Sequence, residues 1–242
     1  MPVKLDHKVM KAGAMREEAA HYALLCRIAP ALRHRLVGRL HPIGLTAAVA
    51  GRLLTTERLN LEGAQDSIAK VQLQAREATV STIATLAWLT GEEAPSVALK
   101  AGVDMCVALV RTDCEMRGVA ISSQIAEMGI VVSQRALRIV LTACLIALVD
   151  RLPQLNRIEL RSAVSEDTIE IHFDLHCTET TQEPSSVTER RPLKWDDVEA
   201  LADHEGVEVF SSGKPPRVKC RFSAIVAGTR SAPGKSALLH NP

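Results

Sequence analysis

The sequence predicts an α+β protein, in which a pair of long helices is followed by a mixed sheet with helices on one face. Between residues 25 and 89, apolar side chains recur every three or four positions, which is the period of one helical stripe. From Arg157 onward, short segments alternate between apolar and polar residues, as strands with one buried face do. Because aromatic residues make up only 2% of the chain, Leu, Val, Ile and Ala must form its core, which favours helix packing.

Each of the two long helices is predicted from its own apolar stripe. The stripe of the first helix consists of Leu25, Ile28, Leu32, Leu36, Leu40, Ile43, Ala47, Ala50 and Leu54. The stripe of the second consists of Leu61, Ala64, Ile68, Val71, Ala75, Ala78, Thr82, Leu86 and Leu89. Since a lone antiparallel pair would leave half of each stripe exposed, we expect two copies to form a dimeric four-helix bundle. Its interface is predicted to contain Leu32, Leu36 and Leu40 with Ile68, Val71 and Ala75.

The pattern changes after Gly91–Ser96, which is interpreted as a hinge. Helices are then predicted over about 97–116, 133–151 and 193–204, and strands over 119–125, 157–164, 168–176, 207–212 and 217–226. The organisation is therefore a helical hairpin in 1–92, an α/β sandwich in 93–228 and a flexible tail in 229–242.

The composition excludes several classes of protein. A net charge of +1 gives no bulk attraction to nucleic acid or to an anionic membrane. The apolar run at 139–149 is shorter than the roughly 20 residues that span a bilayer, and residues 1–13 contain no apolar signal core. The six cysteines form no CxxC pair, which favours reduced thiols. We therefore expect a cytoplasmic protein with no nucleic-acid or membrane partner.

Two histidines stand out in the segment "RHRLVGRLH". At 100° per residue, His34, Gly38 and His41 lie roughly opposite the Leu32–Leu36–Leu40 stripe, and Ala31 and Leu45 extend their face. A neutral imidazole can act as a nucleophile on phosphorus near neutral pH. The alternative is that both are simply exposed histidines. The arginines here, with Arg27 just before them, form either a solvated face or a surface that attracts an acidic partner.

The same segment, together with the order of the elements, resembles the core of bacterial sensor histidine kinases. His34, Leu36 and Leu40 fit the phosphoacceptor segment of that family, whereas Arg35 stands where an acidic residue is expected and Gly38 where Thr or Asn is usual. The resemblance implies a hairpin for dimerisation and phosphotransfer, followed by an ATPase-like domain. It implies that His34 carries the phosphoryl group, and that Ala31, Arg35, Gly38, His41 and Leu45 contact a response-regulator receiver domain.

The ATPase-like part departs from the family where nucleotide would bind. Ala143 and Ala147 stand where the resemblance expects Asn, and Asp150 alone keeps a polar residue. No glycine turn follows Asp174, and the glycine-rich lid is missing. The resemblance is therefore strongest to the dimeric histidine phosphotransferases of phosphorelays. It implies that the protein binds no ATP and has no cofactor of its own, because the receiver supplies Mg²⁺.

Two questions stay open at this point. His172, Asp174 and His176 share one strand face and have side chains suited to zinc, but without an evident fourth ligand a solvated strand face is the favoured interpretation. For function, a phosphotransferase is the first hypothesis. The alternatives are a non-catalytic pseudokinase that binds and regulates a receiver domain or kinase, and an active kinase with an unrecognised nucleotide site.

Overall fold

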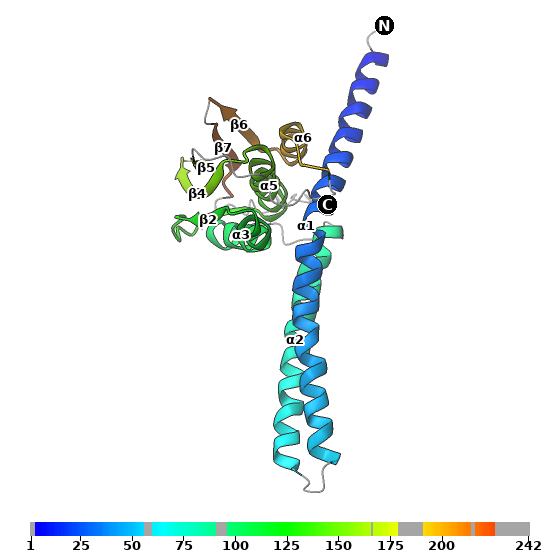
Figure 1. The fold of residues 1–242 in the computed structure, drawn as a ribbon. Helices are drawn as coiled ribbons and strands as arrows, with labels where there is room; N and C mark the ends of the chain where they lie inside the picture. The colour runs from blue at the N-terminus through cyan, green and yellow to red at the C-terminus, as the bar shows by residue number, and fades with distance from the viewer. Residues whose placement is uncertain are drawn as a thin grey trace, which may run out of the picture.

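The computed structural model describes residues 3–55, 60–90, 96–165, 167–178, 191–213 and 216–225. Two long helices, α1 (Val3–Thr55) and α2 (Leu61–Thr90), form a hairpin. The described residues from 96 onward form a separate α+β unit, and the hairpin projects from one side of it (Figure 1). The upstream end of α1 continues past this unit in the opposite direction (Figure 1). The predicted α+β class, with its helical hairpin and mixed sheet, is confirmed.

The hairpin packs largely through small side chains. Ala50 of α1 and Ala64, Ser67 and Ala78 of α2 are buried, and the Ser67 hydroxyl donates to the Gly63 carbonyl oxygen at 2.8 Å. Other members of the predicted stripes are not covered by this contact, as Leu40, Leu54, Leu61, Ile68 and Leu86 all remain exposed. The reason is geometric, because a single neighbouring helix covers a narrower arc than a stripe drawn at steps of three and four.

Helix α1 is much longer than its predicted stripe, which began at Leu25. Its upstream half packs against the α+β unit, where Ala20, Ala23, Leu24 and Ile28 are buried within the main core, and it contacts α3 and α6. Leu32 also belongs to this core. The predicted placement of Leu32 in an interface between two copies is therefore wrong, because the chain itself covers this side chain.

The α+β unit is a mixed sheet with helices on one face (Figure 1). Its helical elements are α3 (Leu99–Met116), α4 (Gln134–Ala136), a π-helical turn η1 (Leu137–Leu141), α5 (Thr142–Arg151) and α6 (Trp195–Glu205). Its strands are β1 (Ser96–Ala98), β2 (Ala120–Ser123), β3 (Val131–Ser133), β4 (Leu155–Val164), β5 (Thr168–Cys177), β6 (Glu208–Ser212) and β7 (Arg217–Ser223). The main sheet has the order β2-β4-β5-β7-β6, in which only β2 and β4 are parallel.

The core lies between this sheet and its helices. Every residue from 136 to 149 is buried, so the most apolar run of the sequence is the central helical layer. Ile169, Ile171 and Phe173 of β5 point inward, as their alternation predicted. The end of α2 joins this layer, because the Arg138 guanidinium of η1 lies 4.1 Å from the centre of the Trp88 ring.

Several details differ from the sequence prediction. The helix expected from residue 97 begins at Leu99, because Val97 pairs with Val132 in a small sheet of β1 and β3 that was not predicted. The six cysteines are free, as expected, and burial raises the pKa of the Cys114 thiol to about 12. None of the described helices is long and apolar enough to cross a membrane. Most of the predicted hinge at Gly91–Ser96 and the predicted tail at 229–242 lie outside the described residues.

Candidate functional site

The candidate site is one face of α1 near the middle of the helix. His34, Gly38, His41 and Leu45 follow one another at steps of four, three and four, so they form one stripe, and all four are exposed. Apart from the two neighbouring residues and the backbone of the helix itself, no described atom lies within 4 Å of the position that a Cβ would take at Gly38, so the surface there is open. We call these four residues the His34 face.

The two remaining residues of the predicted partner surface are less accessible. Ala31 is half-buried and packs against the core of the α+β unit, and Arg35 is half-buried. The structure therefore brings His34 together with Gly38, His41 and Leu45 on an open surface. Ala31 lies where this surface meets the α+β unit.

The orientation of the His34 face follows from Arg27, which lies seven residues earlier. Seven residues turn a helix through about 700°, nearly two full turns, and advance it by about 10 Å. Arg27 reaches into the α+β unit, where its side chain is only 3% exposed. The His34 face therefore points to the side of α1 that bears the α+β unit. A partner bound there would occupy the corner between the hairpin and that unit (Figure 1).

The buried position of Arg27 corrects one expectation. Arg27 was grouped with the exposed basic residues of α1, but its Nη1 donates a hydrogen bond to the Asp150 carboxylate of α5, and both side chains are buried. Arg33 is exposed, and Arg39 pairs with Glu77 of α2 at 3.3 Å, where both side chains are more than half exposed. Arg27 therefore does not contribute to the basic surface predicted for this part of α1.

The helix at which nucleotide would bind in the resembled family has almost no solvent-accessible surface at the two key positions. Ala143 and Ala147 lie on one side of α5 with Asp150, and the two alanines are 0% and 2% exposed. At the end of this stripe, Arg27 of α1 covers the Asp150 side chain, and both side chains are buried. The resemblance indicated at which positions this chain differs from the family, but the sequence gave no sign that the chain's own first helix approaches this stripe.

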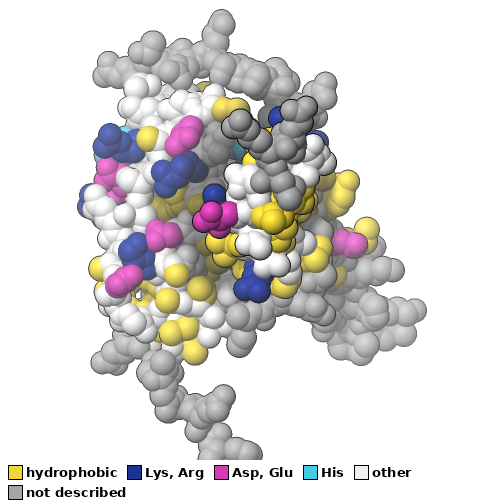
Figure 2. Space-filling model, turned by 90° about the horizontal axis from the view of Figure 1, so that it is seen from below, with side chains coloured by type: hydrophobic (Ala, Val, Ile, Leu, Met, Phe, Trp, Pro, Cys, Tyr) yellow, Lys and Arg dark blue, Asp and Glu magenta, His cyan; other side chains and the backbone are white. Residues whose placement is uncertain are grey.

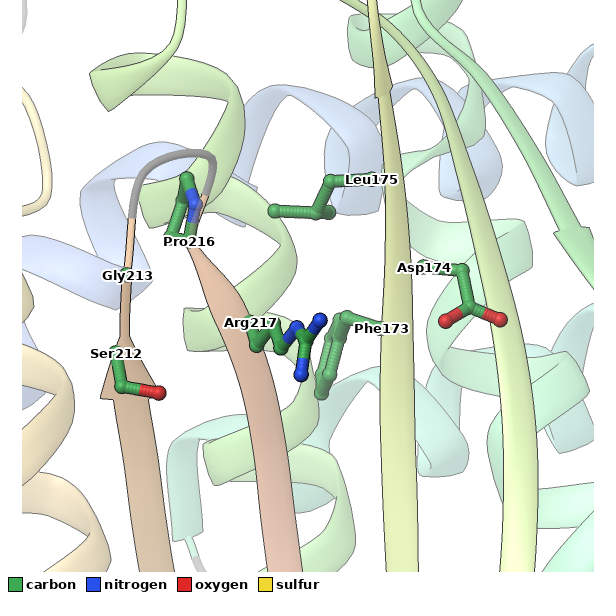
Figure 3. A pocket seen from close by; sticks show the side chains of 7 residues that line it. All are labelled: Phe173, Asp174, Leu175, Ser212, Gly213, Pro216 and Arg217. Atoms are coloured by element: carbon green, nitrogen blue, oxygen red, sulfur yellow. The ribbon is translucent and has the colours of Figure 1, made fainter.

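Asp174 is the residue after which the resembled family has a glycine turn that this chain lacks. Its side chain faces away from the helical layer. Its carboxylate lies 3.0 Å from Nε of Arg161 on β4, and Figure 3 shows it pointing away from Leu175 and Pro216. Those two residues, with Phe173 and Arg217, line a hollow of about 530 Å³ between β5 and the β6–β7 hairpin. The β5–β7 ladder ends at Phe173 and Val218, and Pro216 beyond them has no N–H to extend it.

The strand face once considered for zinc is a network of ion pairs. Nε2 of His172 lies 3.2 Å from Glu170, and Nε2 of His176 lies 3.9 Å from Glu159. Glu170 also accepts hydrogen bonds from Lys219 and Arg221, which lower the pKa of its carboxyl to about 2. Among the residues that the structure describes, no three His, Cys, Asp or Glu side chains are grouped to hold a metal ion.

Neither a protein-family model nor a curated protein matches the sequence. Among solved structures, the Acinetobacter baumannii histidine kinase AdeS is similar, with a TM-score of 0.42, 9% identity and coverage of 78% of this chain and 98% of the other. A histidine kinase from Burkholderia phymatum has a TM-score of 0.39 and 14% identity, and the match covers 80% of this chain and 99% of the other. A bacterial phosphotransferase has a TM-score of 0.35 and 13% identity, and the match covers 84% of this chain and 95% of the other. At these TM-scores the similarities carry no argument about function, which rests on the residues described above.

Proposed function

We propose that this chain is a histidine phosphotransferase-like protein of a bacterial two-component system. It relays phosphoryl groups to or from response-regulator receiver domains and does not bind ATP. The observation that supports the proposal most is the accessibility of His34 in the middle of a continuous helix, on a face open to a partner. The packed stripe of Ala143 and Ala147, closed to solvent, supports the absence of a nucleotide site.

The proposed chemistry needs little from this chain beyond a positioned imidazole. The lone pair of one ring nitrogen of neutral His34 attacks the phosphorus of a receiver aspartyl phosphate. The bond between phosphorus and the aspartyl oxygen breaks, its electron pair stays on the aspartate, and the other ring nitrogen releases its proton to solvent. The receiver supplies Mg²⁺, and the second transfer runs through the same steps in reverse.

The proposal includes a homodimer, because the hairpin leaves an apolar surface without a partner. Leu40 and Ile68 are about half exposed, and Leu54 and Leu61 extend this surface to the loop end of the hairpin. Figure 2, which views the molecule from that end, shows hydrophobic side chains (yellow) gathered at the surface. Burying a leucine stabilises an interface by about 1.5–3 kcal/mol, so several such residues support a stable dimer.

Phosphotransfer is tested by incubating the protein with phosphorylated receiver domains and measuring acid-labile phosphohistidine. We expect His34→Gln to abolish transfer from a cognate receiver. His41→Gln is the matched control, since His41 is also exposed on the His34 face but precedes Pro42, which removes a helical hydrogen bond. His41→Gln should weaken docking and leave transfer detectable. Neither variant should change thermal stability much, because both side chains are exposed.

Normal transfer to the His34→Gln variant would contradict the role of His34. The second candidate is a pseudokinase that binds and regulates a receiver domain or kinase without chemistry, and Arg35 and Gly38 favour it because they replace residue types expected in the phosphoacceptor segment. If the unaltered protein yields no phosphohistidine with any receiver but still binds one, this candidate replaces the first.

A further inference from the structure

A buried carboxylate connects four separate segments of the chain. Asp150 lies near the end of α5, and its side chain is 4% exposed. It accepts hydrogen bonds from Nη1 of Arg27 in α1, from Nη1 of Arg117 after α3 at 2.7 Å, and from the backbone N–H of Leu193 before α6 at 2.8 Å. One aspartate therefore ties the hairpin to three parts of the α+β unit.

A second carboxylate balances the charges of this group. Asp113 of α3 lies 3.6 Å from Nη2 of Arg27 and 3.4 Å from Nη2 of Arg117. The resulting Asp150 cluster consists of Arg27, Asp113, Arg117 and Asp150, and its formal charges sum to zero. A balanced set of this kind avoids the large cost of burying an unpaired charge, but losing one member restores that cost.

The cluster adds a directional element to an otherwise apolar contact. Around Arg27, the upstream half of α1 meets the α+β unit through Ala20, Ala23, Leu24 and Ile28. Apolar burial is non-directional, so these four side chains alone define the rotation and axial position of the helix less sharply than hydrogen bonds do. The hydrogen bonds of Asp150 require one rotation and one axial position of α1.

We propose that the Asp150 cluster is a latch that locks the upstream half of α1 to the α+β unit in a single orientation. The α+β unit then prevents α1 from rotating or sliding, and the two move as one rigid body. Trp88 holds the other hairpin helix to the same helical layer through Arg138. The latch does not depend on phosphotransfer, because it concerns only how two parts of the chain are joined.

Hydrogen–deuterium exchange of the full chain tests the latch. Arg27→Met keeps most of the apolar stem of the side chain and removes its charge. We expect amides 13–31 of α1 to exchange on the order of 100-fold faster, since a buried ion pair is lost and the segment opens locally. Amides of β4 and β5 should be unchanged. Arg39→Met is the matched control, because it removes an exposed pair with Glu77 from the same helix, and it should change exchange less than about fivefold.

A second variant separates charge from packing. Arg27→Lys keeps the charge but not the paired nitrogens that reach both Asp150 and Asp113, so it should accelerate exchange of amides 13–31 less than Arg27→Met does. It also provides the test if the Met variant fails to fold. Unchanged exchange of amides 13–31 in both variants would overturn the latch. Equal acceleration in β4 and β5 would also overturn it, since that result reports global destabilisation.

Discussion

Introducing asparagine at positions 143 and 147 is expected to damage the fold without creating a nucleotide site. Both alanines lie in the central helical layer and are closed to solvent. An asparagine there buries an amide without a hydrogen-bond partner, which costs about 1–3 kcal/mol, and overpacks the layer at a similar cost. At about 3 kcal/mol for Ala143→Asn, the melting temperature of a chain of this length falls by roughly 6–12 °C.

The matched control is Ala108→Asn, which places the same residue on the exposed side of α3. It loses only helix propensity, at most about 0.7 kcal/mol, so its melting temperature should stay within about 3 °C of the unaltered protein. Thermal denaturation measures the first effect, and calorimetric titration with Mg–ATP measures the second. If the Ala143→Asn, Ala147→Asn double variant melts like the control, the layer is not packed as described. If the unaltered protein itself binds Mg–ATP with micromolar affinity, the ATP-independent proposal fails.

Two further predictions concern the hairpin and the sheet. Leu40→Asp should convert a dimer to a monomer in sedimentation at micromolar concentration, whereas Met116→Asp, at a more exposed apolar residue of α3, should not; a monomer before mutation would contradict the proposed bundle. Because the folded pKa of Glu170 lies below its ordinary value of 4.5, its ion pairs stabilise the protein above that pH and are lost as pH falls toward about 2. Glu170→Gln should therefore reduce the pH dependence of the denaturation midpoint between these values, and identical slopes for both proteins would refute this role.

Periodicity predicted the regular elements well because it reports which side of an element is buried. The alternation of Ile169, Ile171 and Phe173 sufficed to orient β5 before the sheet was known. The three-residue strands β1 and β3 were missed because three residues are too short to show a period. The upstream contact of α1 was missed because small residues such as Ala20 contribute little to an apolar stripe.

In the candidate site, the sequence predicted the features that depend on one helix alone and missed those that depend on distant parts of the chain. The exposure of His34 follows from its own helix, so the sequence indicated it correctly. The burial of Arg27 depends on Asp150, a residue 123 positions later in the chain. An arginine on a helix ordinarily indicates a solvated surface, and no local pattern distinguishes one that meets a distant carboxylate. Long-range ion pairs are therefore the part of this site that required the structure.

The continuous path of α1 from Arg27 to His34 constrains how the length of this helix can vary in evolution. Substitutions between the two residues, other than at Pro30, which bends or interrupts the hydrogen bonds of the helix, keep the direction of His34, but the insertion or deletion of one residue would turn the imidazole by about 100° relative to the α+β unit. A shift of seven residues would nearly preserve its direction while moving it by about 10 Å along the helix. Homologous chains that share the Asp150 cluster should therefore differ in sequence between these positions far more readily than in the number of residues.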